Sequence, residues 1–148
     1  RVRGTPVRIE ERVAGLSTSK LIWKRSDDVW SIQENVGHLL TLEPLWATRL
    51  SQLIDGLPEL LAWEETNSST WEANYNTQEI ENILSRFRSA RSEFVSRLET
   101  IDSSLIERHA LHPRLKTPMR TIDLVYFVAE HDDYHLSQIS RIFREHTE

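Results

Sequence analysis

The sequence predicts an all-α protein that folds as a four-helix bundle. Helix breakers are few, since the 148 residues include only four glycines and five prolines. Four segments place apolar residues at the three- and four-residue spacing of an amphipathic helix. No segment shows the alternating pattern that indicates a strand. Helices of this kind bury their apolar stripes against one another, and four of them form a bundle.

Composition limits the classes of function. The length suits one core, so we expect a single bundle domain over residues 1–148, and a first residue other than methionine is consistent with a trimmed N-terminus. The net charge of −5, without a basic patch, argues against a nucleic-acid partner. The sequence has no run of 18 apolar residues and no signal peptide, which predicts a cytoplasmic protein without a membrane partner. Without cysteine, the chain supplies no disulfide and no thiolate.

The first two helices are predicted from periodicity and capping. Residues 6–16 form the first helix, residues 17–24 add a turn, and a loop follows. Ser31 and Glu34 make a capping box, in which each side chain can bond the backbone N–H of the other. A long helix over residues 32–57 follows it. Pro44 lies inside this helix and is expected to kink it or to start a new turn.

Residues 58–75 carry no helical pattern but include Trp63 and Trp71. A loop of this length in a compact domain is usually functional or disordered, and its aromatic residues argue against disorder. Two interpretations are open. The loop folds over a pocket as a lid, or the two tryptophans plug the end of the core.

The last two helices follow the same reasoning. Asn76 and Glu79 offer a second capping arrangement, and the third helix runs to about residue 101. A connection over residues 102–117 leads to the last helix, residues 118–145. Pro118 suits the first position of that helix, and Asp123 lies near its positive end.

Two histidines occupy the apolar stripe of the last helix. His131 and His135 are four residues apart, which places them on one helix face. The same face carries apolar residues on either side of them: Leu124, Val128, Ile139 and Ile142. Buried imidazoles need partners for their nitrogens. They are hydrogen-bonded core histidines, half-exposed residues at the end of the bundle, or metal ligands.

Known metal motifs with this spacing do not match. The zincin motif requires Glu directly after the first histidine, where this chain has Asp132. The di-iron bundle requires Glu-x-x-His pairs, which the chain lacks. The best third ligand is His38 in the second helix, where the adjacent Gly37 allows a chain segment or ligand to approach closely. The alternative for His38 is a half-buried boundary histidine, and the remaining histidines rank lower as ligands: His109, His112 and His146.

These residues lie in strings that resemble the DinB/YfiT-like superfamily. The matching strings are VWSIQENVGHLLTLEPLW, residues 29–46, and VAEHDDYHLSQI, residues 128–139. The segment ALHPRLKTPMRTIDL also resembles the His-Pro-Arg-Leu loop of the branch that contains thiol S-transferases. The resemblance implies a four-helix bundle, often dimeric, with a divalent metal on His38, His131 and His135. It also implies activities such as those of bacillithiol- and mycothiol-dependent transferases and isomerases. The first helix is short for this family.

The leading hypothesis is a metal-dependent thiol S-transferase, or a related hydrolase, that acts on a small-molecule substrate. Three protein ligands leave open coordination positions on zinc, nickel or iron, and such a cation lowers the pKa of a water or thiol that it binds. Because the chain lacks cysteine, sulfur chemistry requires a low-molecular-weight thiol as cosubstrate. His112 and Arg114 are candidates to contact it, although an exposed surface role for Arg114 is equally open.

Asp132 and Glu34 are candidates to accept a hydrogen bond from a ligand imidazole. The rival hypothesis is a non-catalytic, metal-binding dimeric bundle used in stress response or regulation. Under either hypothesis the resemblance predicts a homodimer.

Overall fold

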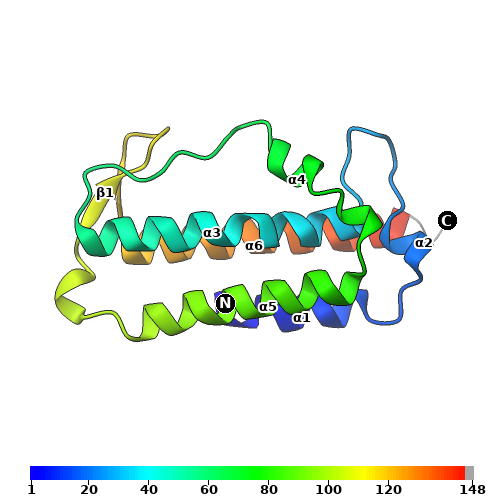
Figure 1. Ribbon diagram of the computed structural model, residues 1–148, viewed down its shortest axis with the longest axis horizontal. Helices are drawn as coiled ribbons and strands as arrows, with labels where there is room; N and C mark the ends of the chain where they lie inside the picture. Colours follow the sequence, from blue (N-terminus) through cyan, green and yellow to red (C-terminus); the bar gives the residue numbers. More distant parts are fainter. Residues whose placement is uncertain (146–148) are drawn as a thin grey trace.

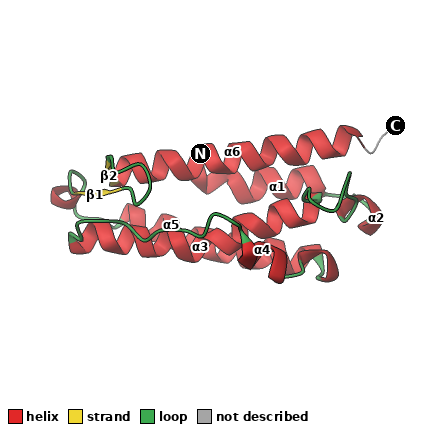
Figure 2. Cartoon of the chain, turned by 90° about the horizontal axis from the view of Figure 1, so that it is seen from above, coloured by secondary structure: helices red, strands yellow, loops and turns green. Residues whose placement is uncertain are grey.

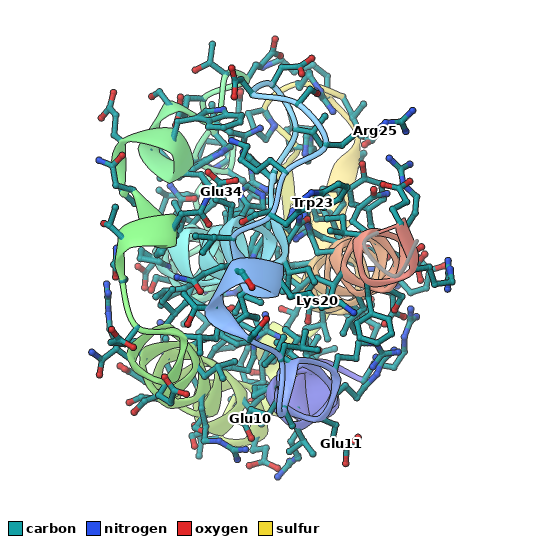
Figure 3. All side chains as sticks on the ribbon, turned by 90° about the vertical axis from the view of Figure 1, so that its right-hand side faces the viewer. Glu10, Glu11, Lys20, Trp23, Arg25 and Glu34 are labelled. Atoms are coloured by element: carbon teal, nitrogen blue, oxygen red, sulfur yellow. The ribbon has the colours of Figure 1, made fainter. Side chains whose placement is uncertain are left out.

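Four helices, three of them long, pack side by side in the computed structural model, which describes residues 1–145 (Figure 1). They are α1 (Thr5–Val13), α3 (Ile32–Asp55), α5 (Ile80–Glu99) and α6 (Thr121–Glu145). In the end-on view of Figure 3, α3 and α6 lie above α5 and α1, and Lys20, Trp23 and Glu34 lie at the end facing the viewer. None of the helices among these residues is long and apolar enough to cross a membrane.

Short elements precede α1 and lie in the connections between the bundle helices. The helical ones are η1 (Val2–Gly4), α2 (Thr18–Leu21), α4 (Ser68–Glu72), η2 (Tyr75–Thr77) and η3 (Ser103–Leu105). Two strands, β1 (His109–Leu111) and β2 (Pro118–Arg120), form an antiparallel hairpin. Figures 1 and 2 show this hairpin at one end of the bundle and α2 at the other.

The predicted start of α3 is confirmed. The Ser31 hydroxyl accepts the Glu34 N–H at 3.0 Å, and the Glu34 carboxylate accepts the Ser31 N–H at 2.8 Å. The helix continues through Pro44, which is exposed, so no new helix starts there. It ends two residues earlier than predicted because Gly56 adopts a left-handed conformation with φ 73°.

The capping prediction for α5 was wrong. The helix begins at Ile80 with Glu79 as its N-cap, and no side chain caps it. Asn76 instead lies in η2, where its Oδ1 accepts a hydrogen bond from the Ser31 hydroxyl at 2.7 Å. The Asn76 side chain, which the local pattern assigned to capping, is thus used in a contact with Ser31, a residue distant in the sequence.

The expectation of no strands, and of helical Pro118, was also wrong. Pro118 pairs with Leu111 at the end of the hairpin, and α6 starts at Thr121. Three-residue strands are too short to show a period-two pattern. The hairpin is joined to the segment after α3, because the Leu111 N–H donates to the Pro58 carbonyl and the Leu111 carbonyl accepts the Leu60 N–H. Asp123 does lie in the first turn of α6, where it accepts the Arg120 N–H.

Two clusters of buried apolar residues fill the bundle, and a polar layer separates them. One cluster takes residues 42–53 of α3, 94–95 of α5 and 124–129 of α6. The other takes residues 32–40 of α3, 83–87 of α5 and 136–142 of α6. Near the boundary of the two clusters each of these helices contributes a buried ionisable residue, namely Glu43, Arg91 and Asp132.

The Arg91 guanidinium holds this layer together. It donates to Glu43 at 2.6 and 3.0 Å, to Asp132 at 2.5 and 3.1 Å, and to the Val2 carbonyl at 3.0 Å. Asp132 also accepts the Thr5 hydroxyl at 2.6 Å. All three ionisable side chains are at most 3% exposed. One cluster of contacts therefore connects α1, α3, α5 and α6.

Replacing Arg91 with methionine is expected to destabilise the protein by about 3–5 kcal/mol, because two buried carboxylates would lose their cation. Urea unfolding measures the change. The matched control is Arg88→Met on the same helix, where the arginine pairs with Glu10 at the surface and the loss should be much smaller. Equal losses for both variants would contradict the role assigned to Arg91.

Candidate metal centre

The structure brings His38, His131 and His135 together, as the sequence predicted. Each offers a ring nitrogen, and these three atoms lie within 4.8 Å of one another. His38 comes from α3, and the other two come from adjacent turns of α6. The Nε2 atoms of His38 and His131 are 3.3 Å apart. His38 and His135 are buried and His131 is half-buried, so His38 is not the boundary histidine of the alternative interpretation.

Asn35 sets the orientation of His135. The Asn35 amide nitrogen donates to the Ser31 carbonyl at 2.7 Å, which leaves its Oδ1 directed at His135 Nδ1 at 2.9 Å. An amide oxygen only accepts, so Nδ1 of His135 must carry the proton. Its Nε2 then keeps a lone pair for a metal. The turn that caps α3 therefore also orients His135 for metal binding.

Thr70 plays the corresponding part for His38. Its hydroxyl lies 2.8 Å from His38 Nδ1, so His38 can present Nε2 to the cluster. Thr70 is 1% exposed and comes from α4, in the segment that carries no pattern in the sequence. Neither Thr70 nor Asn35 was predicted. Asn35 lies four residues after the cap residue and three before His38, a spacing that gives no metal-site signal by itself.

Burial keeps the three imidazoles neutral. It lowers the pKa of His38 to about 3, that of His131 to about 4 and that of His135 to about 2. The proximity of His131 lowers the pKa of the other two further. Metal ligation requires neutral imidazole. At neutral pH a cation therefore does not have to displace protons from this cluster.

The donor set fits a divalent transition metal. Three neutral imidazole nitrogens are a common ligand set for zinc and its neighbours in the first transition row. The Nε2 atoms of His38 and His131 share a hydrogen bond at 3.3 Å, in which one ring donates to the other, and a cation bound by both nitrogens would replace it. Within residues 1–145, Nδ1 of His131 is buried without a hydrogen-bond partner. His131 therefore differs from His38 and His135, whose Nδ1 atoms each contact a polar side chain.

The three histidines line a pocket of about 850 Å³, whose other lining residues come from α3, α6 and the loops, and none of the described residues of α1 or α5 is among them. This volume is in the range of small-molecule sites. Of the described residues, none from α1 lines the pocket, so the short first helix does not affect it. Its walls are largely aromatic, with Trp30, Trp46, Trp63, Phe127 and Tyr134.

The segment between α3 and α4 lines this pocket through residues 62–65 and 67, and Figure 1 shows it running alongside α3. Trp63 lines the pocket, as expected if the loop is a lid, and it also packs against one apolar cluster, as expected if the tryptophan plugs the core. Trp71 does not plug the core. It is 38% exposed and lies beside Trp30 and the Lys24 ammonium.

The His-Pro-Arg-Leu loop reaches the same pocket. His112 is buried, and its Nδ1 accepts the backbone N–H groups of Arg114 and Leu115 at 3.3 and 3.1 Å. Burial lowers the pKa of His112, and Arg49 and Arg114 add to this effect. The Arg114 side chain is 70% exposed, with Glu65 at 3.9 Å. His112 thus shapes the loop, and Arg114 stands at the pocket wall.

Other sequence predictions around the site need correction. Asp132 and Glu34 do not bond a ligand imidazole. Asp132 is taken by Arg91 and Thr5, and Glu34 by the cap of α3. Gly37 does allow a close approach, and the group that approaches is the Tyr75 ring. His109 lies exposed on β1, and His146 lies outside the described residues.

Comparisons with known proteins identify the fold. The sequence model of the DinB superfamily matches residues 1–139. Among solved structures, YfiT from Bacillus subtilis superposes with a TM-score of 0.83 at 17% sequence identity, over 99% of this chain and 83% of that chain. That protein is described as a probable metal-dependent hydrolase with an unusual four-helix bundle topology. The predicted four-helix bundle is therefore confirmed. No curated protein matches the sequence.

Protein purified without chelators is expected to carry about one divalent metal ion per chain, because the three nitrogens form a single ligand set. His135→Ala should lose the metal, whereas His109→Ala, at an exposed histidine far from the cluster in sequence, should keep it. Elemental analysis of both variants gives the measurement. Retention of metal by His135→Ala would rule out this site.

Asn35→Ala should weaken metal binding by about 10- to 100-fold, because His135 loses the acceptor that fixes its tautomer. The metal dissociation constant, measured by chelator competition, gives this change. Asn76→Ala is a suitable control, since it removes another contact of the same cap residue, Ser31. If the two variants bind metal equally well, the hydrogen bond from His135 has no such effect.

Proposed function

The chain belongs to the DinB superfamily, and on this premise we propose that it is a metal-dependent enzyme whose reaction centre lies at His38, His131 and His135. One observation carries the proposal. The three histidines line a pocket of about 850 Å³ and are not enclosed in the core. Three protein ligands beside a pocket leave coordination positions for small molecules, which is the arrangement of catalytic sites.

The cofactor that fits these residues is a divalent transition metal, and zinc, nickel and iron all suit imidazole ligands. Such an ion supplies one kind of chemistry here, since it lowers the pKa of a water or thiol bound to it. The protein contributes the rest. Asn35 and Thr70 hold two of the imidazoles, and the tryptophans of the wall give a substrate apolar surfaces to pack against.

Within this class we favour a thiol S-transferase. The chain has no cysteine, so the sulfur nucleophile would be a low-molecular-weight thiol that enters the pocket. The loop that resembles the thiol S-transferase branch lines this pocket through His112 and Arg114, which supports its assignment to cosubstrate binding. The exposed Arg114 guanidinium is free to move toward an incoming anion, since its nearest acidic partner is 3.9 Å away.

Hydrolysis is the second candidate, and a specific observation favours it. YfiT, which shares this fold, is described as a probable metal-dependent hydrolase. Water would replace the thiol as nucleophile in the same pocket. The non-catalytic alternative is less well supported, because a purely structural metal site is normally closed by four protein ligands. The homodimer and the cytoplasmic location stay predictions.

Metal-loaded protein is expected to transfer glutathione, bacillithiol or mycothiol to a soft electrophile such as a chlorobimane or an epoxide. Replacing any of His38, His131 or His135 should reduce the rate to that of metal-free protein, because the three ligands act as a unit. Initial rates measured with and without metal provide the test. His109→Ala serves as the folded control and should keep full activity.

A metal-loaded protein that accelerates none of the three thiol reactions would exclude the transferase assignment. Metal-dependent cleavage of ester or amide substrates, lost in the same variants, would then establish the hydrolase instead. If neither reaction responds to metal, the non-catalytic role becomes the better explanation.

A further inference from the structure

Arg49 is a buried cation without a counter-ion. Its side chain is 3% exposed, and within residues 1–145 it takes part in no ion pair. Its one side-chain hydrogen bond runs from Nε to the Leu61 carbonyl at 3.0 Å. Buried guanidinium groups are normally paired, as Arg91 is in this same protein. The two terminal nitrogens of Arg49 are therefore available to a partner that the chain does not supply.

Arg49 lines the metal pocket. It follows His38 by eleven residues, which is close to three full helical turns, so both residues lie on the same face of α3. The Trp46 ring is a neighbour of both Arg49 and His131 within the pocket. Its centroid lies 5.6 Å from the Arg49 guanidinium carbon and 5.7 Å from the His131 ring. A ligand that reaches across one indole can thus contact both Arg49 and the metal centre.

The acidic residues of the pocket are engaged elsewhere. The Glu64 carboxylate accepts the Thr66 hydroxyl and the backbone N–H groups of Ser68 and Ser69. These hydrogen bonds hold the pKa of Glu64 well below its usual range. Glu65 lies beside Arg114. Neither acid is paired with Arg49.

A second unused donor lies next to Arg49. Nε1 of Trp46 is buried and has no hydrogen-bond partner in the described part of the chain, and the whole residue is 2% exposed. A buried donor without an acceptor is unfavourable unless a ligand provides one. Because this nitrogen is covered by protein atoms, we assign the carboxylate to the Arg49 guanidinium, whose two terminal nitrogens can donate to its two oxygens.

We propose that Arg49 forms an anion subsite that binds a carboxylate of the substrate or thiol cosubstrate, while the rest of that molecule lies against Trp46 and reaches the metal centre. One negative charge balances the single unpaired positive charge of Arg49. This inference rests on the proposed function only for the position of the reaction centre. It assigns the main anion contact to Arg49, in the buried part of the pocket, whereas Arg114 stands exposed.

Binding of a matched pair of probes tests the subsite without requiring turnover. The probes are 3-phenylpropanoate and its neutral amide, which differ in charge but hardly in shape. Isothermal titration of the metal-loaded protein should show tighter binding of the carboxylate, by about tenfold or more. Arg49→Met should remove that preference, and Arg49→Lys should restore part of it because it keeps the charge but not the paired donors.

The control variant is Arg97→Met. Arg97 also bonds α3, through the Ala47 carbonyl and the Ser51 hydroxyl, but it lies outside this pocket. It should keep the full carboxylate preference. Titration of chelator-treated protein separates the two possible anion contacts. A preference that survives metal removal and disappears in Arg49→Met supports the subsite.

Two results would overturn the subsite. One is equal affinity of the wild-type protein for carboxylate and amide. The other is a preference that Arg49→Met leaves unchanged and metal removal abolishes, since the anion would then be bound by the metal. A protein that prefers the carboxylate but catalyses no reaction would refute the proposed function and support the subsite. A protein that catalyses the reaction but does not prefer the carboxylate would support the proposed function and refute the subsite.

Discussion

The ion cluster around Arg91 is the constraint on which the rest of the structure depends. The buried Arg91 guanidinium is paired with two carboxylates, and these come from α3 and α6. Apolar residues of the same volume could give equal stability, so the value of the cluster lies in fixing how the helices align. Asp132 follows His131 directly, and Glu43 follows His38 by five residues. Once Arg91 fixes these two carboxylates, it also fixes the heights at which the histidines of α3 and α6 meet.

The two sides of the α3–α6 pair are chemically different. On the side of α1 and α5, the charged groups are paired, as Arg91 is with its carboxylates, although Oε2 of Glu43 has no hydrogen-bond partner among the described residues. On the other side, donors and lone pairs remain unused: the Arg49 guanidinium, Nε1 of Trp46 and Nδ1 of His131. A protein retains such unfavourable groups where a ligand completes them. This contrast distinguishes the face that stabilises the fold from the face that we propose binds ligands.

Irregular segments complete the second face. The segment after α3 is fixed to the helix at Leu61, whose carbonyl accepts from Arg49 and whose N–H donates to Gln52. It leads to α4, which delivers Thr70 to His38. The same chain then returns to α3 at Tyr75, which packs on Gly37 and bonds Thr41. The loop therefore belongs to the site as much as the helices do.

The sequence by itself determined the features that depend on neighbouring residues. Helical periodicity located α3, α5 and α6, the Ser31–Glu34 capping box marked the start of α3, and the four-residue spacing placed His131 and His135 on one face. Spacing could not show that Asn76 bonds Ser31 instead of capping a helix, that Asp132 faces Arg91, or that Thr70 supports His38. Nor could it distinguish buried Arg49 from the many exposed arginines. These outcomes depend on contacts between residues 30 or more positions apart, or on burial, as for Arg49. Only the packing of the helices decides which of the possible partners meet.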